Sequence, residues 1–184
     1  MTDKATPARE AVPGPEAIDS VEELLAHAYM IEVDATDRYL MLADQMDVHN
    51  NPELAQLFRK LASHEEHHAQ EILVQAKGME LPELKPSEYK WGDFEGPEAA
   101  EMDQAHYLMT PWHALQMAFA AEKRAFAFFD RLVATARNDE MKKWAEEFRE
   151  EEAEHVRLVE DLLKRYPEPD KDWDEDPDPP VFPE

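Results

Sequence analysis

The sequence contains no cysteine among its 184 residues. This absence excludes disulfide scaffolds, thiol catalysis, zinc ribbons and every iron–sulfur site bound by cysteine. The first twenty residues hold no apolar run, so we expect no signal peptide. No apolar stretch reaches the about 18 residues that a membrane span needs. We therefore expect a cytoplasmic protein without a membrane segment.

Basic residues are scarce: 19 lysines and arginines stand against 43 aspartates and glutamates, for a formal net charge of −24. Nucleic-acid binding needs a basic face, so this charge argues against a nucleic-acid partner. The apolar fraction of 43% is enough for a hydrophobic core. A solvated acidic surface is the simplest interpretation of the charge.

The composition divides the chain into three parts. Residues 1–18 contain prolines and lack periodicity, which predicts a flexible arm. Residues 167–184 are rich in proline and acidic side chains, which predicts a disordered tail that is solvated, collects cations or contacts a partner. Residues 19–166 lie between them and carry the periodic segments, so they form the predicted folded domain.

Four segments of this domain have apolar residues at helical spacing, and none reads as a strand. Their N-terminal signals are Ser20 with Glu23, Asn51 with Pro52, Thr110 with Pro111, and the turn 137–139. Short connections make the first two segments one antiparallel hairpin and the last two another. Residues 79–109 form a long crossover, with a short helix predicted near 97–107. The fold class is therefore all-α, a four-helix bundle of two antiparallel hairpins.

Charged or imidazole side chains interrupt each apolar stripe where core residues are expected. These residues are Glu32, Glu65, His68, Glu122, Glu152 and His155. Counted from the hairpin turns, they lie at one level of the bundle to within about a helical turn. The two hairpins also match each other at a nearly constant sequence offset, which indicates an internal repeat. Charged residues tolerated at helix ends or at an interface are the alternative interpretation.

Buried carboxylates are costly unless they are paired or coordinated. Two divalent cations would balance the charge of four carboxylates, and each neutral histidine would add a nitrogen ligand. Carboxylate and imidazole ligands suit iron or manganese. The spacing of Glu-x-x-His places both side chains on one helix face. The pattern therefore predicts a dinuclear site for iron or manganese.

This ligand pattern resembles that of the ferritin-like di-iron proteins, in which two helices give one Glu each and two give Glu-x-x-His. The segments LFRKLASHEEHHAQEIL, FREEEAEHVRLVE, EVDATDRY and EKRAFAFF resemble the rubrerythrin-type family over roughly residues 20–165. The resemblance implies bridging roles for Glu65 and Glu152, and terminal ligand roles for Glu32 and Glu122. It also implies that His68 and His155 bind one metal each.

The resemblance implies a non-haem di-iron oxidoreductase that reduces H2O2 or O2, and it suggests a homodimer. Because the chain cannot hold a rubredoxin-like iron site, an external electron-donor protein is expected. Ala125 stands where many rubrerythrins place a further glutamate, which brings the ligand set closer to ferroxidase centres. A ferroxidase for iron storage is therefore the second hypothesis. A non-catalytic, metal-stabilised interaction module is the third.

Four further residues near the predicted ligands have open roles. Tyr39 lies two turns after Glu32 on the same helix face. Three roles are open for it: a hydrogen-bond partner outside the ligand set, a one-electron relay, or a core aromatic. His64 and His67 are predicted to be surface histidines, with His64 as an alternative ligand. Asp34 is predicted to lie on a solvated face.

Overall fold

The computed structural model describes residues 18–91, 96–100, 102 and 105–175, and over these residues the protein is all-helical. The elements are α1 (Val21–Val48), α2 (Pro52–Gln75), the 3-10 helix η1 (Pro86–Glu88), α3 (Pro111–Thr135) and α4 (Asp139–Leu163). No strand occurs in this part of the chain. The predicted four-helix bundle is confirmed.

Side chains of the predicted start signals cap the helices. The Ser20 hydroxyl accepts a hydrogen bond from the Glu23 amide at 3.1 Å. Asn51 and Asn138 likewise accept from backbone amides of the first turns of α2 and α4. Such caps satisfy amides that have no partner within the helix. At the other end of α2, Gly78 adopts a φ of 95°, which only glycine tolerates readily.

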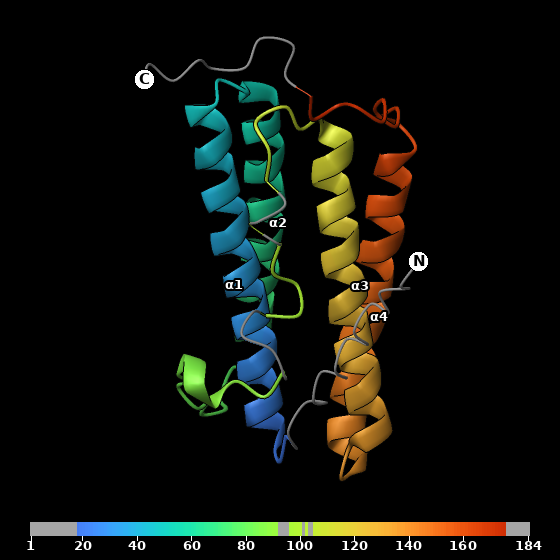
Figure 1. The fold of residues 1–184 in the computed structure, drawn as a ribbon. Helices are drawn as coiled ribbons and strands as arrows, with labels where there is room; N and C mark the ends of the chain where they lie inside the picture. The colour runs from blue at the N-terminus through green and yellow to red at the C-terminus, as the bar shows by residue number, and fades with distance from the viewer. Residues whose placement is uncertain (1–17, 92–95, 101, 103–104, 176–184) are drawn as a thin grey trace, which may run out of the picture.

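The helices pair as two hairpins, α1 with α2 and α3 with α4 (Figure 1). A tight turn with Asn50 at a φ of 57° joins α1 to α2. The crossover returns the chain to the end of the bundle where α3 begins, as Figure 1 shows. The hairpins and the crossover are confirmed.

A short helix is predicted near 97–107. Of the described residues in this range, Met102 has 3-10 helical geometry, 97–98 and 107–108 form turns, and residues 101, 103 and 104 lie outside the described part of the chain. The crossover also contains η1. Close to the first of these turns, two carbonyls have partners in α3. Pro97 and Ala99 accept hydrogen bonds from the Arg124 guanidinium of α3, rather than from amides of a helix of their own.

The apolar core consists of two clusters. One contains Ala35, Leu42 and Phe58 and lies toward the α1–α2 turn, and the other contains Ile31 and Phe148. Along every helix of the bundle, the predicted ligands fall between residues of one cluster and residues of the other. A polar layer therefore divides the core, and apolar side chains close it from both ends.

Three further contacts tie the crossover to the bundle. His27 of α1 accepts a hydrogen bond from the Lys90 amide at 3.1 Å, and the buried Trp91 packs edge-on against its ring. At the far end, the Asn51 side-chain Nδ2 donates to the Met109 carbonyl at 3.1 Å. None of the helices in the described residues combines the length and apolar character that a bilayer crossing requires.

Candidate metal centre

The six predicted ligands come together inside the bundle, and each helix contributes to the site. The glutamates are almost fully buried, with exposed fractions of 5% for Glu32, 1% for Glu65, and 2% for both Glu122 and Glu152. The side chains of His68 and His155 are 17% and 12% exposed. Helical spacing brought these residues into the core, as the sequence predicted, because they continue the apolar stripes.

Their ligand atoms form two half-sites. Each half-site offers one atom per residue, all within 4.8 Å of one another. The first comprises Glu32, Glu65 and His68, in which His68 Nδ1 lies 3.6 Å from Glu65 Oε2. The second contains Glu122, Glu152 and His155, in which His155 Nδ1 lies 3.4 Å from Glu122 Oε2. The two hairpins thus form similar half-sites from equivalent positions of the repeat.

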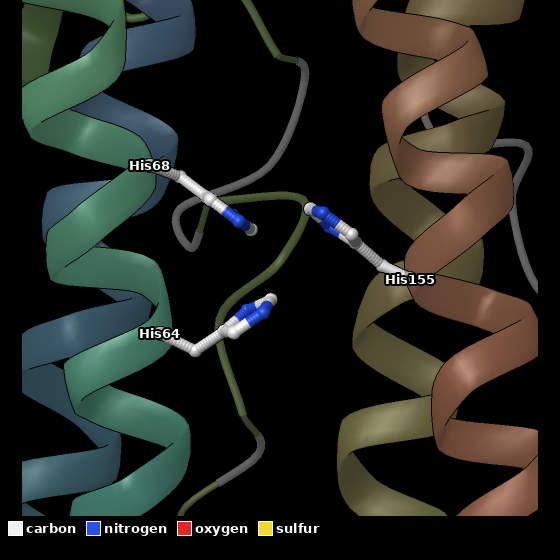
Figure 2. Close-up of side chains that lie close together, drawn as sticks. All are labelled: His64, His68 and His155. Carbon is white, nitrogen blue, oxygen red and sulfur yellow. The ribbon is translucent and has the colours of Figure 1, made fainter.

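The two half-sites face each other across the bundle. Figure 2 shows His68 of α2 and His155 of α4 pointing toward one another, and their ring centroids are 4.3 Å apart. The ring planes are nearly parallel, at 8°. The two half-sites therefore lie next to each other, one on each hairpin.

The electrostatics of the site reflect concentrated negative charge. Burial, together with the charges of Glu152 and Glu65, raises the pKa of Glu32 well above its usual range. Burial and the neighbouring Glu122 raise the pKa of Glu152 to about 7. Burial acts to lower the pKa of His155, but Glu122 and Glu152 outweigh it and raise that pKa to about 11. The carboxylates thus favour any positive charge placed among them.

Many polar atoms of this cluster lack hydrogen-bond partners. They are the Oε2 atoms of Glu32, Glu65, Glu122 and Glu152, and the Nδ1 atoms of His68 and His155. A buried polar group without a partner costs about 1–3 kcal/mol, and a charged one more. Since oxygen and imidazole donors are the ligands that iron and manganese accept, these atoms fit two divalent cations.

A seventh residue belongs to the second half-site and was missed in the sequence. Glu98 of the crossover is fully buried and lies with Glu122, Glu152 and His155. Helical periodicity could not reveal it, because the segment around Glu98 is a turn. A carboxylate within a proline- and glycine-containing crossover carries no spacing signal that identifies a ligand.

The two additional histidines of α2 differ from each other. His67 is exposed and pairs with Glu71 at 3.3 Å, which confirms its predicted surface position. His64 is half exposed, but its ring centroid lies 4.3 Å from that of His68 and 5.4 Å from that of His155. In Figure 2 it points toward the same space as the other two rings. The surface prediction for His64 is therefore right only in part.

Tyr39 is completely buried and stacks on Phe58, so its ring is part of the core. Its hydroxyl has no hydrogen-bond partner. Burial and the charges of Glu65 and Glu122 raise its pKa well above the usual range. The ring is thus a core aromatic whose hydroxyl is influenced by the metal-site carboxylates, and its role beyond packing stays a prediction.

A pocket connects the site with the surface between α2 and α4. It reaches Glu32, His68 and His155, and its exposed rim carries the acidic residues Glu71, Glu151 and Glu154. An acidic entrance raises the local concentration of cations. Small molecules and metal ions therefore have a path to the half-sites.

Comparison with known proteins agrees with this geometry. A family model described as Rubrerythrin matches residues 23–163. The crystal structure of an uncharacterised conserved protein from Magnetospirillum magnetotacticum MS-1 is similar at 36% sequence identity and a TM-score of 0.61. That match covers 83% of this chain and 99% of the other. No curated protein sequence gives a match. The family match spans all four helices and all six predicted ligands, and the chain therefore belongs to the rubrerythrin family.

Proposed function

We propose that the protein is a non-haem di-iron oxidoreductase that reduces H2O2, or O2, with electrons from an external donor. The observation that carries this proposal is the set of buried carboxylate and imidazole atoms without hydrogen-bond partners. Two bound iron ions would supply the two electrons that reduce H2O2 to water, and a donor would then restore them. Membership of the rubrerythrin family supports iron as the metal.

The proposed ligand roles follow the resemblance to rubrerythrin-type proteins. Glu65 and Glu152 would bridge the two ions, Glu32 and Glu122 would each bind one ion, and His68 and His155 would complete the two half-sites. Apolar clusters cover the layer from both ends of the bundle. In that environment fixed charges act more strongly than they do in water. Proton supply would come through the pocket, whose carboxylates line the path to His68 and His155.

These 184 residues contain no cysteine to bind a rubredoxin-like iron site, so the proposal takes the electrons from a donor outside them. A separate donor protein is therefore part of the proposal. A homodimer is a further part of it and is supported by the family resemblance. Sedimentation velocity of the full chain tests the dimer, and a monomer at working concentrations would contradict it.

A ferroxidase that oxidises Fe(II) for storage is the second candidate. The acidic rim of Glu71, Glu151 and Glu154 favours it, because such an entrance attracts Fe(II). A non-catalytic, metal-stabilised interaction module remains the third candidate. It differs from both in one measurable property: its bound metal would not change oxidation state when oxidants are added.

Anaerobic titration with Fe(II), followed by stopped-flow mixing with H2O2 or O2, separates the three. We expect two ions per chain and much faster oxidation by H2O2. Faster oxidation by O2 with mineral formation would support the ferroxidase, and an unoxidised metal would support the interaction module. Glu65→Gln should lose metal, whereas Glu66→Gln, at the next and exposed position of α2, should not. A wild-type protein that binds no iron would overturn the proposal.

A further inference from the structure

We propose that Glu98 of the crossover is an additional metal ligand in the half-site of Glu122, Glu152 and His155, which makes the two half-sites unequal. This inference rests on the proposed metal centre. It adds a ligand that does not come from the four-helix pattern.

The environment of the Glu98 side chain supports a ligand role. Glu98 is 0% exposed, and neither of its carboxylate oxygens has a hydrogen-bond partner. One of these oxygens lies within 4.8 Å of ligand atoms of Glu122, Glu152 and His155. A buried charge without a partner is strongly unfavourable. A cation shared with the three neighbours would remove that penalty.

The backbone on either side of Glu98 is held by a side chain of α3. Arg124 Nε donates to the Pro97 carbonyl at 3.0 Å, and Arg124 Nη2 donates to the Ala99 carbonyl at 2.7 Å. The guanidinium therefore binds the carbonyls of the residues directly before and after Glu98. Charge-assisted, two-point bonds of this kind fix orientation, so Arg124 is a positioning residue for the Glu98 carboxylate.

A second anchor comes from α1. The Gly96 amide donates to Asp34 Oδ2 at 3.1 Å. A Cβ atom at position 96 would lie 2.9 Å from the same oxygen, so the Asp34 side chain would have to shift if residue 96 carried a side chain. Asp34 lies two residues after Glu32, and Arg124 lies two residues after Glu122. The two residues therefore occupy equivalent positions of the repeat. The two helices that present terminal ligands thus also hold the Glu98 turn between them.

The consequence is an asymmetric centre. In the described residues, the half-site of Glu32, Glu65 and His68 gathers two carboxylates, whereas the other gathers three. Greater negative charge binds a cation more tightly at equal geometry. The first metal ion should therefore enter the Glu98 half-site. The additional carboxylate should also stabilise the more highly charged, oxidised ion and lower its reduction potential.

The experiment is a Co(II) titration of the full-length, metal-free protein, followed by visible absorption and calorimetry. The wild-type protein should show two separate binding steps. Glu98→Gln should weaken the tighter step by at least about tenfold, change its absorption spectrum, and leave the weaker step unchanged. Glu83→Gln, which removes an exposed carboxylate of the same crossover, is the matched control and should behave like wild type.

Arg124→Lys tests the positioning role. It should weaken the same tighter step by about tenfold and shift its absorption bands, whereas Arg131→Lys, at an exposed position of the same helix, should do neither. Circular dichroism establishes that each variant is folded. Identical titrations for wild type and a folded Glu98→Gln would overturn the inference while leaving the metal centre intact. A wild-type protein that binds no metal would instead overturn the proposed function.

Discussion

His68 and His155 stack in parallel at the centre of the bundle, with ring centroids 4.3 Å apart and planes 8° apart. Two imidazoles that face each other in this way among four buried carboxylates need a common reason for their proximity. The proposed dinuclear centre would supply it, because each ring belongs to a different half-site.

Glu152→Gln should make the stability of the metal-free protein less dependent on pH. The folded-state pKa of Glu152, about 7, lies above its ordinary value of 4.5. Its contribution to stability is therefore complete below the ordinary pKa and is lost as pH rises through about 7. At about pH 8 the variant should be more stable than wild type by roughly 1–3 kcal/mol. Thermal unfolding in chelator across this pH range measures the difference.

The control for this experiment is Glu150→Gln, which removes an exposed carboxylate of the same helix. Its unfolding curve should follow that of wild type at every pH. A Glu152→Gln protein with the same pH profile as wild type would show that the buried carboxylate carries no penalty. With metal bound, the order should reverse, because the variant lacks a ligand.

His27 should anchor the crossover only while it is neutral. Its Nδ1 donates to the Glu23 carbonyl at 2.8 Å, so its Nε2 is free to accept from the Lys90 amide at 3.1 Å. Burial lowers the pKa of His27 below 6.5. This contribution is complete above pH 6.5 and is lost as pH falls through the lower folded-state pKa. We expect protection of the Lys90 amide against hydrogen exchange to fall accordingly.

His27→Gln offers the comparison, because glutamine keeps a neutral acceptor at this position. After correction for intrinsic exchange rates, the variant should show no loss of protection at Lys90 in the acid range. Equal acid sensitivity in the two proteins would mean that the crossover is released by another group.

Gly96→Ala should destabilise the protein through its contact with Asp34. The new methyl group would lie 2.9 Å from Asp34 Oδ2 and would displace the hydrogen bond to the position-96 amide. We expect a loss of about 1 kcal/mol in the free energy of unfolding. The double variant Gly96→Ala with Asp34→Ala should be less affected than the sum of the two single variants, because the clash is then absent. Additive effects in chemical denaturation would contradict this explanation.

Tyr39→Phe should distinguish a packing role of the Tyr39 ring from a redox role of its hydroxyl. The hydroxyl has no hydrogen-bond partner, so its removal should change the free energy of unfolding by no more than about 0.5 kcal/mol. Metal stoichiometry should remain that of wild type. If Tyr39 relays single electrons, rapid-freeze EPR after mixing with H2O2 should detect a tyrosyl radical in wild type that the variant lacks. Tyr29→Phe is the control, and a radical that persists in Tyr39→Phe would rule out the relay.

The repeat of the two hairpins explains why so much of the site could be predicted. Glu65 and His68 are one helical turn apart, as are Glu152 and His155, and each pair continues an apolar stripe that must face the core. Local periodicity thus determines both the face and the level of these side chains. The predicted surface location of Asp34 was wrong in part, because its backbone partner Gly96 lies in a distant segment.

His64 shows a second limit of the pattern. His64 lies one turn before His68, which is compatible with a surface position or with a position beside the predicted ligand. Spacing along one helix does not distinguish these two positions. The structure brings its ring to within 5.4 Å of His155 because α4 packs across from α2 at this level. The distance between hairpins is a property of packing, so it does not appear in the sequence of either helix.

By itself, the sequence determined the four helices, their pairing and the six residues of the polar layer, because these depend on helical periodicity and on short connections. Only the tertiary structure decided that Glu98 joins that layer and that the half-sites differ. The reason is that the crossover has no period, and its path is set by contacts with residues far away in the chain. Arg124 and Asp34 make those contacts, and they hold Glu98 among the ligands.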